Sequence, residues 1–264
     1  MPRTDAAGGG DTTGDAARVG RRAVKRQSGP VVAGLALAGL ALRWRELRAI
    51  RSDGKRAEGT PISFGMWVVA DPDAAVGRAT RAGSDDGAAS VPYFGLVWPA
   101  AKSLVAKILT GPRLDGARVL DLGCGLGACG LASARLGARV TFFDREPRAI
   151  EIVEASARAP EWRAETFEYV VGDWRMPPPL EPFDLILAAD VLYDRHAGSA
   201  VAAFLVGHLR PGAEAWLADP GRVQAERFPT VARDAGLELT GTERLPSRAE
   251  QPDVGLLRLR RPLA

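Results

Sequence analysis

Three glycines stand at alternate positions in residues 119–127, whose sequence is VLDLGCGLG, between an apolar run and a helical stretch. They are Gly123, Gly125 and Gly127, and Asp121 stands two residues before the first. Glycine is needed where the backbone turns tightly and where a ligand must approach it closely. The spacing therefore predicts a strand, a ligand-binding loop and a helix, with a carboxylate beside the loop.

A second acid, Asp144, directly follows the apolar run Val140–Phe143 and lies 21 residues after Gly123. When a glycine loop joins a strand to a helix, an acid at the tip of the neighbouring strand can accept hydrogen bonds from the hydroxyls of a ribose. The loop and Asp144 together predict a ligand that contains a nucleoside.

Two kinds of cofactor compete for this arrangement. The glycines at 125, 127 and 130 formally match the dinucleotide fingerprint, in which a pyrophosphate lies at the helix N-terminus. An aspartate just before the loop would repel that anion, whereas it would attract the sulfonium and ammonium groups of S-adenosylmethionine. Asp121 therefore favours S-adenosylmethionine. The alternative of a tight turn without any ligand leaves both acids unexplained.

Alternating apolar strands and helices must position these residues. The expected strands are Ala117–Leu122, Val140–Phe143, Phe167–Val171, Phe183–Ala188 and Ala213–Ala218, and the helices between the first three are Ala128–Leu136 and Pro147–Arg158. This alternation predicts βαβ units, whereas Leu237–Leu245 and Val254–Arg260, with only a polar loop between them, predict an antiparallel hairpin. The expected fold class is α/β: a Rossmann-like, doubly wound, mostly parallel seven-stranded sheet with a C-terminal antiparallel hairpin and an N-terminal cap segment.

Three regions are expected along the chain. Residues 1–60 read as a disordered or loosely attached basic extension, in which the apolar run Val31–Leu42 forms a short helix. Residues 61–112 read as the cap segment, and residues 113–264 as the domain that holds the cofactor. The apolar run is shorter than the roughly 20 residues that a membrane span requires, so no stable membrane insertion is expected.

Composition excludes several classes of protein. Two cysteines and two histidines in 264 residues leave no disulfide framework and little room for a zinc site, so no metal is expected. Residues 1–60 carry 12 Lys and Arg against 6 Asp and Glu, and the remainder carries 23 against 26. The positive charge thus belongs to the extension and gives no reason to expect nucleic-acid binding by the body. A cytoplasmic monomer is the expectation.

The chain resembles the class I S-adenosylmethionine-dependent methyltransferases in the VLDLGCGLG loop and in Asp144. Within that class, the chain resembles the group of protein-lysine and nicotinamide N-methyltransferase-like sequences. The stretches that carry this resemblance are Trp98-Pro99, Gly172-Asp173-Trp174 and residues 189–193 (ADVLY). The stretch 219–222 (DPGR) is similar to the branch that modifies the electron transfer flavoprotein β subunit. The resemblance covers roughly residues 91–225.

The resemblance implies roles for particular residues. Trp98 would lie against the cofactor, Asp144 would hold the ribose, and Asp173 and Trp174 would flank the adenine. The loop glycines would lie beneath the amino-acid part of the cofactor. The complete set of expected cofactor contacts is Trp98, Asp121, Gly123, Gly125, Gly127, Asp144, Asp173, Trp174 and Ala189.

Methyl transfer to an amine depends on alignment of the acceptor with the methyl group. Asp190 and Tyr193 stand just past the fourth strand and are the candidate catalytic residues, because a carboxylate can orient an amine and an aromatic face can shape its channel. Arg222, after the fifth strand, is the candidate for binding the acceptor. The predicted function is methylation of a lysine in a protein, and the resemblance implies a substrate like the electron transfer flavoprotein β subunit. Methylation of a small-molecule amine and a non-catalytic nucleotide-binding regulatory domain stay open as alternatives.

Overall fold

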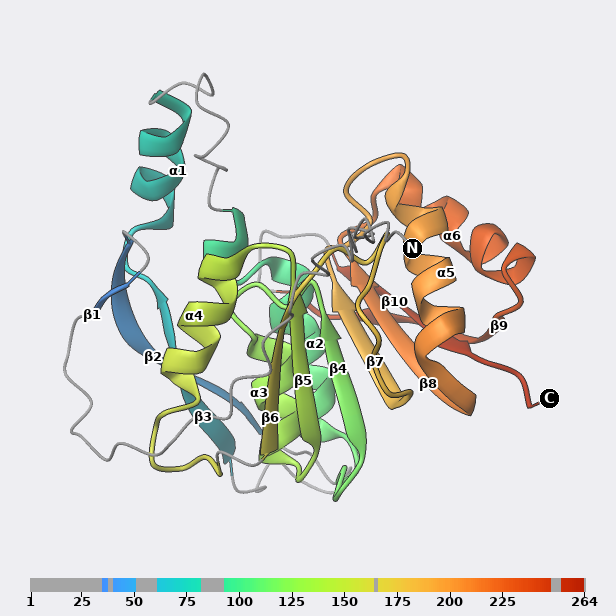
Figure 1. The fold of residues 1–264 in the computed structure, drawn as a ribbon, viewed down its shortest axis with the longest axis horizontal. Coiled ribbons are helices and arrows are strands. Elements are labelled where there is room, and N and C mark those ends of the chain that lie inside the picture. The colour runs from blue at the N-terminus through green and yellow to red at the C-terminus, as the bar shows by residue number, and fades with distance from the viewer. Residues whose placement is uncertain are drawn as a thin grey trace, which may run out of the picture.

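A seven-stranded mixed sheet forms the centre of the protein, which we describe from a computed structural model that covers residues 35–37, 40–50, 61–81, 93–163, 166–247 and 253–263 (Figure 1). The prediction for residues 1–30 lies outside the described residues. The strand order is β6-β5-β4-β7-β8-β10-β9. The strands are β4 (Arg118–Leu122), β5 (Arg139–Asp144), β6 (Phe167–Val171), β7 (Phe183–Ala189), β8 (Leu209–Asp219), β9 (Glu238–Leu245) and β10 (Val254–Arg260).

Strands β4 to β8 run parallel, and β10 is antiparallel to both β8 and β9. The predicted α/β fold class and the C-terminal hairpin are therefore confirmed. The chain winds outward from β4 through β5 to β6, then returns to the other side of β4 through β7 and β8. This reversal creates a switch point at the carboxyl end of β4, which is where open α/β sheets bind their ligands.

Helices cover both faces of the sheet, and each face has its own apolar core. Val119 and Phe142 pack with one core, whereas the alternate residues Leu120 and Phe143 pack with the other. Because successive side chains of a strand point to opposite faces, such strands are apolar throughout. Side chains from α2 (Pro99–Thr110), α3 (Ala128–Arg135) and α4 (Pro147–Ser156) enter the first core, and side chains from α5 (Ala197–His208) and α6 (Val223–Asp234) enter the second.

The N-terminal part contains strands where a helix was predicted. β1 (Leu35–Leu37), β2 (Leu40–Ile50) and β3 (Pro61–Val69) form an antiparallel sheet beside the main one (Figure 1). Leu40 and Leu42 are buried, whereas Ala41 and Arg43 are exposed, which is the period of a strand. The predicted helix over residues 31–42 is thus wrong at residues 35–37 and 40–42, because these two segments pair with each other as β1 and β2, and β2 continues along β3.

Side chains of the main domain fix the free edge of β3. The amide of Gly65 donates to Glu161 Oε1 at 3.1 Å, and the amide of Trp67 donates to Ser156 Oγ at 2.9 Å. Arg135 Nε donates to the carbonyl of Ser63 at 2.9 Å. The boundary predicted at residue 60 therefore cuts a sheet that is joined to the domain, and residues 40–50 are not a loose extension.

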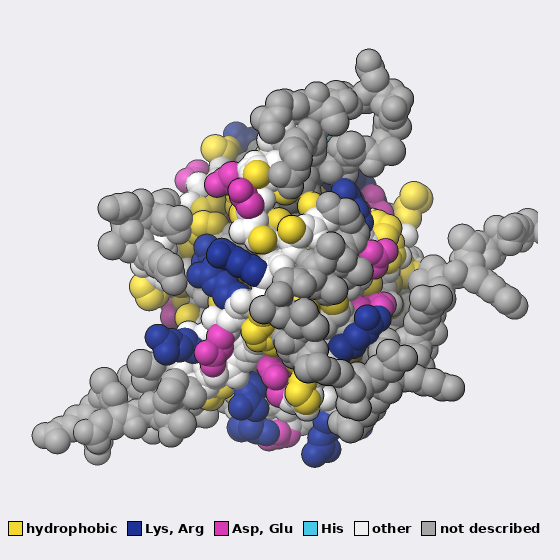
Figure 2. All heavy atoms as spheres, turned by 90° about the vertical axis from the view of Figure 1, so that its left-hand side faces the viewer, with side chains coloured by type: hydrophobic (Ala, Val, Ile, Leu, Met, Phe, Trp, Pro, Cys, Tyr) yellow, Lys and Arg dark blue, Asp and Glu magenta, His cyan; other side chains and the backbone are white. Residues whose placement is uncertain are grey.

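The surface beside this sheet carries charges of both signs. Figure 2 shows Lys and Arg side chains interspersed with Asp and Glu and with apolar side chains on the described part of that face. The cap segment continues through α1 (Pro72–Arg81) and a short 3-10 helix (Tyr93–Gly95) before α2. Among the described residues, no helix is both long enough and apolar enough to cross a membrane.

Candidate active site

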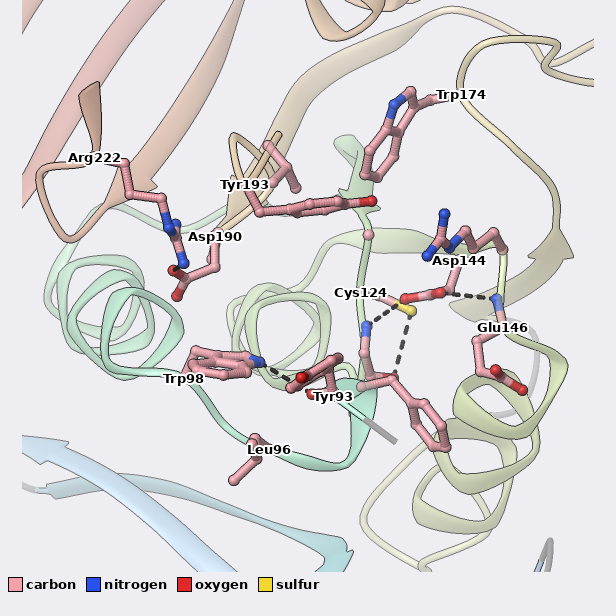
Figure 3. A pocket seen from close by; sticks show the side chains of 16 residues that line it. Tyr93, Leu96, Trp98, Cys124, Asp144, Glu146, Trp174, Asp190, Tyr193 and Arg222 are labelled. Carbon is pink, nitrogen blue, oxygen red and sulfur yellow. Dashed lines mark hydrogen bonds and ion pairs between the residues drawn. The ribbon is translucent and has the colours of Figure 1, made fainter. Parts of the chain in front are cut away.

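A cavity of about 390 Å³ opens at the carboxyl ends of the central strands (Figure 3). It lies at the switch point, between the loops that follow β4, β5, β6, β7 and β8 and the segment that leads into α2. Its lining residues are Tyr93, Phe94, Leu96, Trp98, Gly123, Cys124, Gly125, Asp144, Arg145, Glu146, Trp174, Ala189, Asp190, Val191, Tyr193 and Arg222.

The glycine loop forms the floor of this cavity. Gly123 and Gly125 have φ angles of 64° and 52°, a backbone conformation that residues with a Cβ rarely adopt. A Cβ on Gly123 would lie 3.2 Å from the ring of Trp174, and one on Gly125 would lie 3.2 Å from the carbonyl oxygen of Phe94. Gly127, with φ of 76°, is the N-cap of α3 and does not line the cavity.

Asp144 joins the glycine loop to the tip of β5. Its Oδ2 accepts a hydrogen bond from Gly125 N at 2.8 Å, and its Oδ1 accepts one from Glu146 N at 2.9 Å. Burial raises the pKa of Asp144, and the two amides oppose that shift. Each carboxylate oxygen can accept more than one hydrogen bond, so the side chain keeps capacity for a ligand hydroxyl in the cavity that it lines.

Asp121 lies beneath the loop and not in the lining of the cavity. Its Oδ2 accepts from Gly130 N at 2.7 Å, so it ties β4 to the first turn of α3. The side chain is buried, and this desolvation raises its pKa to about 7. Sequence reasoning expected Asp121 to meet the cofactor, whereas the structure gives it a contact with the backbone.

Two pairs of aromatic rings line the cavity (Figure 3). Trp98 is the N-cap residue of α2, and its Nε1 donates to the carbonyl of Tyr93 at 3.1 Å. The rings of Trp174 and Tyr193 lie with centroids 6.1 Å apart. Asp173, next to Trp174, is outside the lining and accepts a hydrogen bond from Arg175 N through its Oδ1 at 2.8 Å.

Asp190 is held at the cavity wall in an uncommon conformation. Its φ is 61°, and among the described residues it is the one non-glycine residue with positive φ. Its amide donates to the carbonyl of Ala218 at 3.0 Å, and its carboxylate pairs with Arg222 at 2.7 Å (Figure 3). Burial raises the pKa of Asp190, while the charge of Arg222 opposes this shift and that of Asp219 adds to it.

Sequence reasoning missed part of the lining. The missed lining residues, each within five positions of a residue that it chose, are Tyr93, Phe94, Leu96, Cys124, Arg145, Glu146 and Val191. Their position beside Trp98, the glycines, Asp144 and Asp190 was the available signal. His196 stands at the N-cap position of α5 and is not in the lining. No group of three or more potential metal ligands occurs among the residues that the structure describes.

Comparison with protein families matches residues 119–212 to the family described as a methyltransferase domain. The match spans the glycine loop, Asp144 and Asp190, which contribute to the lining of the cavity. Residues 119–212 are therefore similar to a methyltransferase domain.

Curated relatives of this methyltransferase domain include enzymes that act on protein lysines. The electron transfer flavoprotein β subunit lysine methyltransferase of Xenopus laevis is 30% identical over 53% of this chain and 57% of its own length. The protein N-lysine methyltransferase METTL21A of Danio rerio is 38% identical over 37% of this chain and 47% of its own length. The chain thus spans about half the length of these relatives.

A solved structure shares the fold of the domain. The magnesium protoporphyrin IX methyltransferase of Synechocystis PCC 6803, crystallised with bound SAM, has a TM-score of 0.52 and 20% identity, covering 61% of this chain and 77% of that one. At this identity the likeness is one of fold.

The cavity of the methyltransferase domain has the chemistry that S-adenosylmethionine requires. Gly123 and Gly125 leave a floor without side chains, where a Cβ would lie only 3.1–3.2 Å from atoms of Val191 and Phe94. Asp144 offers a buried carboxylate to a pair of hydroxyls, and the ring of Trp174 offers an apolar surface to a purine. The residues present therefore fit this cofactor.

Proposed function

We propose that the protein transfers a methyl group from S-adenosylmethionine to the side-chain nitrogen of a lysine in a protein substrate. The observation that carries this proposal is the buried carboxylate of Asp190, which lies in the same cavity as the glycine loop and Asp144. The names of two relatives, both lysine methyltransferases, support a protein lysine as the acceptor.

Residues on three sides of the cavity would hold the cofactor. Gly123 and Gly125 would lie beneath its amino-acid part, Asp144 would accept the ribose hydroxyls, and Trp174 would lie against the adenine. Trp98 would close the side next to α2. When bound, S-adenosylmethionine supplies a methyl group activated by a positively charged sulfur.

The acceptor side of the cavity has to receive an amine with a free lone pair. The buried Asp190 carboxylate can accept a hydrogen bond from that amine and so fix the direction of its lone pair. Tyr193 is 45% exposed, and its ring contacts Trp174, so it would form the side of the channel by which a lysine stem enters. An apolar stem with a polar end suits a channel of aromatic walls that ends at a carboxylate.

Identification of the labelled product tests the proposal. Purified protein is incubated with S-adenosylmethionine that carries a radioactive methyl group and with a lysate of the source cell, beside a purified electron transfer flavoprotein β subunit as a first candidate acceptor. Acid hydrolysis of the labelled protein should release methylated lysine, and Asp190→Asn should leave the same sample almost unlabelled.

Other products would refute the proposal in distinct ways. Label in the small-molecule fraction indicates an N-methyltransferase for a small amine, and methylated histidine indicates another protein acceptor. Cofactor binding without transfer to any fraction indicates a regulatory domain. The proposal also takes the protein to be a cytoplasmic monomer, which size-exclusion chromatography and cell fractionation test.

A further inference from the structure

Arg222 bridges two buried carboxylates at the cavity wall. Its Nη2 lies 2.7 Å from Asp190 Oδ1, and its Nη1 lies 2.8 Å from Asp219 Oδ2. The two aspartate side chains are each 7% exposed, and that of Arg222 is 31% exposed. Figure 3 shows the guanidinium directed at Asp190.

Sheet register brings the two aspartates to the same level. Ala189 of β7 pairs with Ala218 of β8, so the residue after each of them stands at the carboxyl edge of the sheet. These residues are Asp190 and Asp219. Two carboxylates that are buried close together repel each other, and the guanidinium between them offsets that repulsion.

The turn after β8 fixes where Arg222 starts. Asp219 Oδ1 accepts hydrogen bonds from Gly221 N at 2.9 Å and from Arg222 N at 2.7 Å. Gly221 has a φ of 96°, which a residue with a Cβ rarely adopts. Asp219 therefore holds Arg222 twice, by its backbone and by its guanidinium, immediately before α6 begins.

These contacts give Arg222 a role different from docking of the acceptor. Both Nη groups of its guanidinium face the two carboxylates, and the three side chains together carry a net charge of −1. That charge suits an amine and disfavours an anionic acceptor. Asp190 can still accept a hydrogen bond from an amine while it keeps its ion pair, because each carboxylate oxygen accepts more than one.

We infer that Arg222 is a positioning residue, which holds the Asp190 carboxylate at the cavity wall in the orientation that receives the acceptor amine. The inference rests on the proposed function, because Arg222 would affect methyl transfer only by placing the carboxylate that receives the acceptor amine. It predicts that loss of Arg222 lowers turnover and spares the cofactor.

Kinetics of Arg222→Ala and Arg222→Lys on the acceptor that the wild-type protein labels provide the first test. Arg222→Ala should lower kcat by about 100-fold, the effect of a misplaced catalytic group, and leave the Kd of S-adenosylhomocysteine within about threefold. Arg222→Lys keeps the charge and should recover part of kcat. Arg260→Ala is the matched control, because Arg260 also pairs with a carboxylate of β8, Glu214, but in the middle of that strand and outside the lining of the cavity.

A double-mutant cycle separates positioning from a general loss of structure. In the Asp190→Asn background, Arg222→Ala should lower kcat by less than about threefold, since the group that Arg222 positions is already altered. An undiminished loss in that background would overturn the inference, as would wild-type kcat in Arg222→Ala. Equal losses of kcat and cofactor affinity with a lowered Tm, not recovered by lysine, would make Arg222 a structural residue only.

Crystal structures of the two variants test the inference without an acceptor. The Asp190 carboxylate should leave its place at the wall in Arg222→Ala and keep it in Arg222→Lys. An unmoved carboxylate in Arg222→Ala overturns the inference even where methyl transfer is established. Absence of any transfer by the wild-type protein, with the carboxylate displaced in Arg222→Ala, refutes the proposed function and leaves the positioning geometry standing.

Discussion

Replacement of Asp144 by alanine should weaken cofactor binding more than the loss of a ribose contact alone would do. A hydrogen bond to a charged group contributes about 1.5–3 kcal/mol, so the ribose contact by itself corresponds to a Kd raised about 10- to 150-fold. The structure adds a second loss, because Asp144 also holds Gly125 N at 2.8 Å and Glu146 N at 2.9 Å. Without these hydrogen bonds the ligand has to order the glycine loop when it binds. We therefore expect the Kd to rise by about 150-fold or more, the upper end of that estimate.

Calorimetric titration of S-adenosylhomocysteine into wild-type protein, Asp144→Ala and Asp144→Asn measures this effect. Asparagine keeps one acceptor oxygen and should give an intermediate Kd. Asp115→Ala is the matched control, because Asp115 also has a local partner, Arg113, but is exposed and stands before β4 at the other end of the sheet.

Two results would refute the reasoning about Asp144. A Kd within about threefold of wild type for Asp144→Ala, at an unchanged Tm, would mean that neither the ribose contact nor the loop bond matters, since either should exceed a tenfold effect. An unchanged Kd with a lowered Tm would make Asp144 a residue of the fold alone.

Three further predictions concern other residues. Asp190→Asn should lower kcat by about 100-fold or more while the Kd of S-adenosylhomocysteine changes by less than about threefold, and wild-type kcat would remove Asp190 from the mechanism. A truncated protein that starts at Thr60 loses β1 and β2, including the buried Leu40 and Leu42, whose burial contributes about 3–6 kcal/mol. The Tm of this truncated protein should therefore fall clearly in thermal melts. An unchanged Tm would contradict the role of this sheet. Because burial raises the pKa of Asp121 to about 7, the stability that its protonated form contributes is present below about pH 4 and is lost as the pH rises to about 7. Asp121→Asn should therefore flatten the decline of Tm over this range, and equal slopes for both proteins would show that Asp121 does not titrate there.

Local patterns determined the main sheet. The apolar runs and the helices between them predicted the strands of the α/β domain, because each strand is buried on both faces and so is apolar along its whole length. The polar loop between residues 245 and 254 left no room for a crossover helix and so predicted the antiparallel pairing of β9 with β10. The glycine spacing likewise predicted the loop, since the conformations at Gly123 and Gly125 depend on the backbone of those residues themselves.

Contacts between distant segments decided the rest. β2 is a strand because β3 pairs with it across residues 51–60, and Trp44 packs edge-to-face on Trp67 with centroids 5.4 Å apart. No local period in residues 31–42 could reveal that partner.

Tertiary structure also separated residues that look alike in the sequence. Asp121 and Asp144 both accompany apolar strands, but Asp121 points to the face that α3 covers and bonds to Gly130, whereas Asp144 ends its strand and reaches the cavity. In the sequence, Arg222 looks like an ordinary turn residue that follows a strand. Its pairing with Asp190 exists because β7 and β8 are neighbours in register, so that two carboxylates buried side by side need a cation between them.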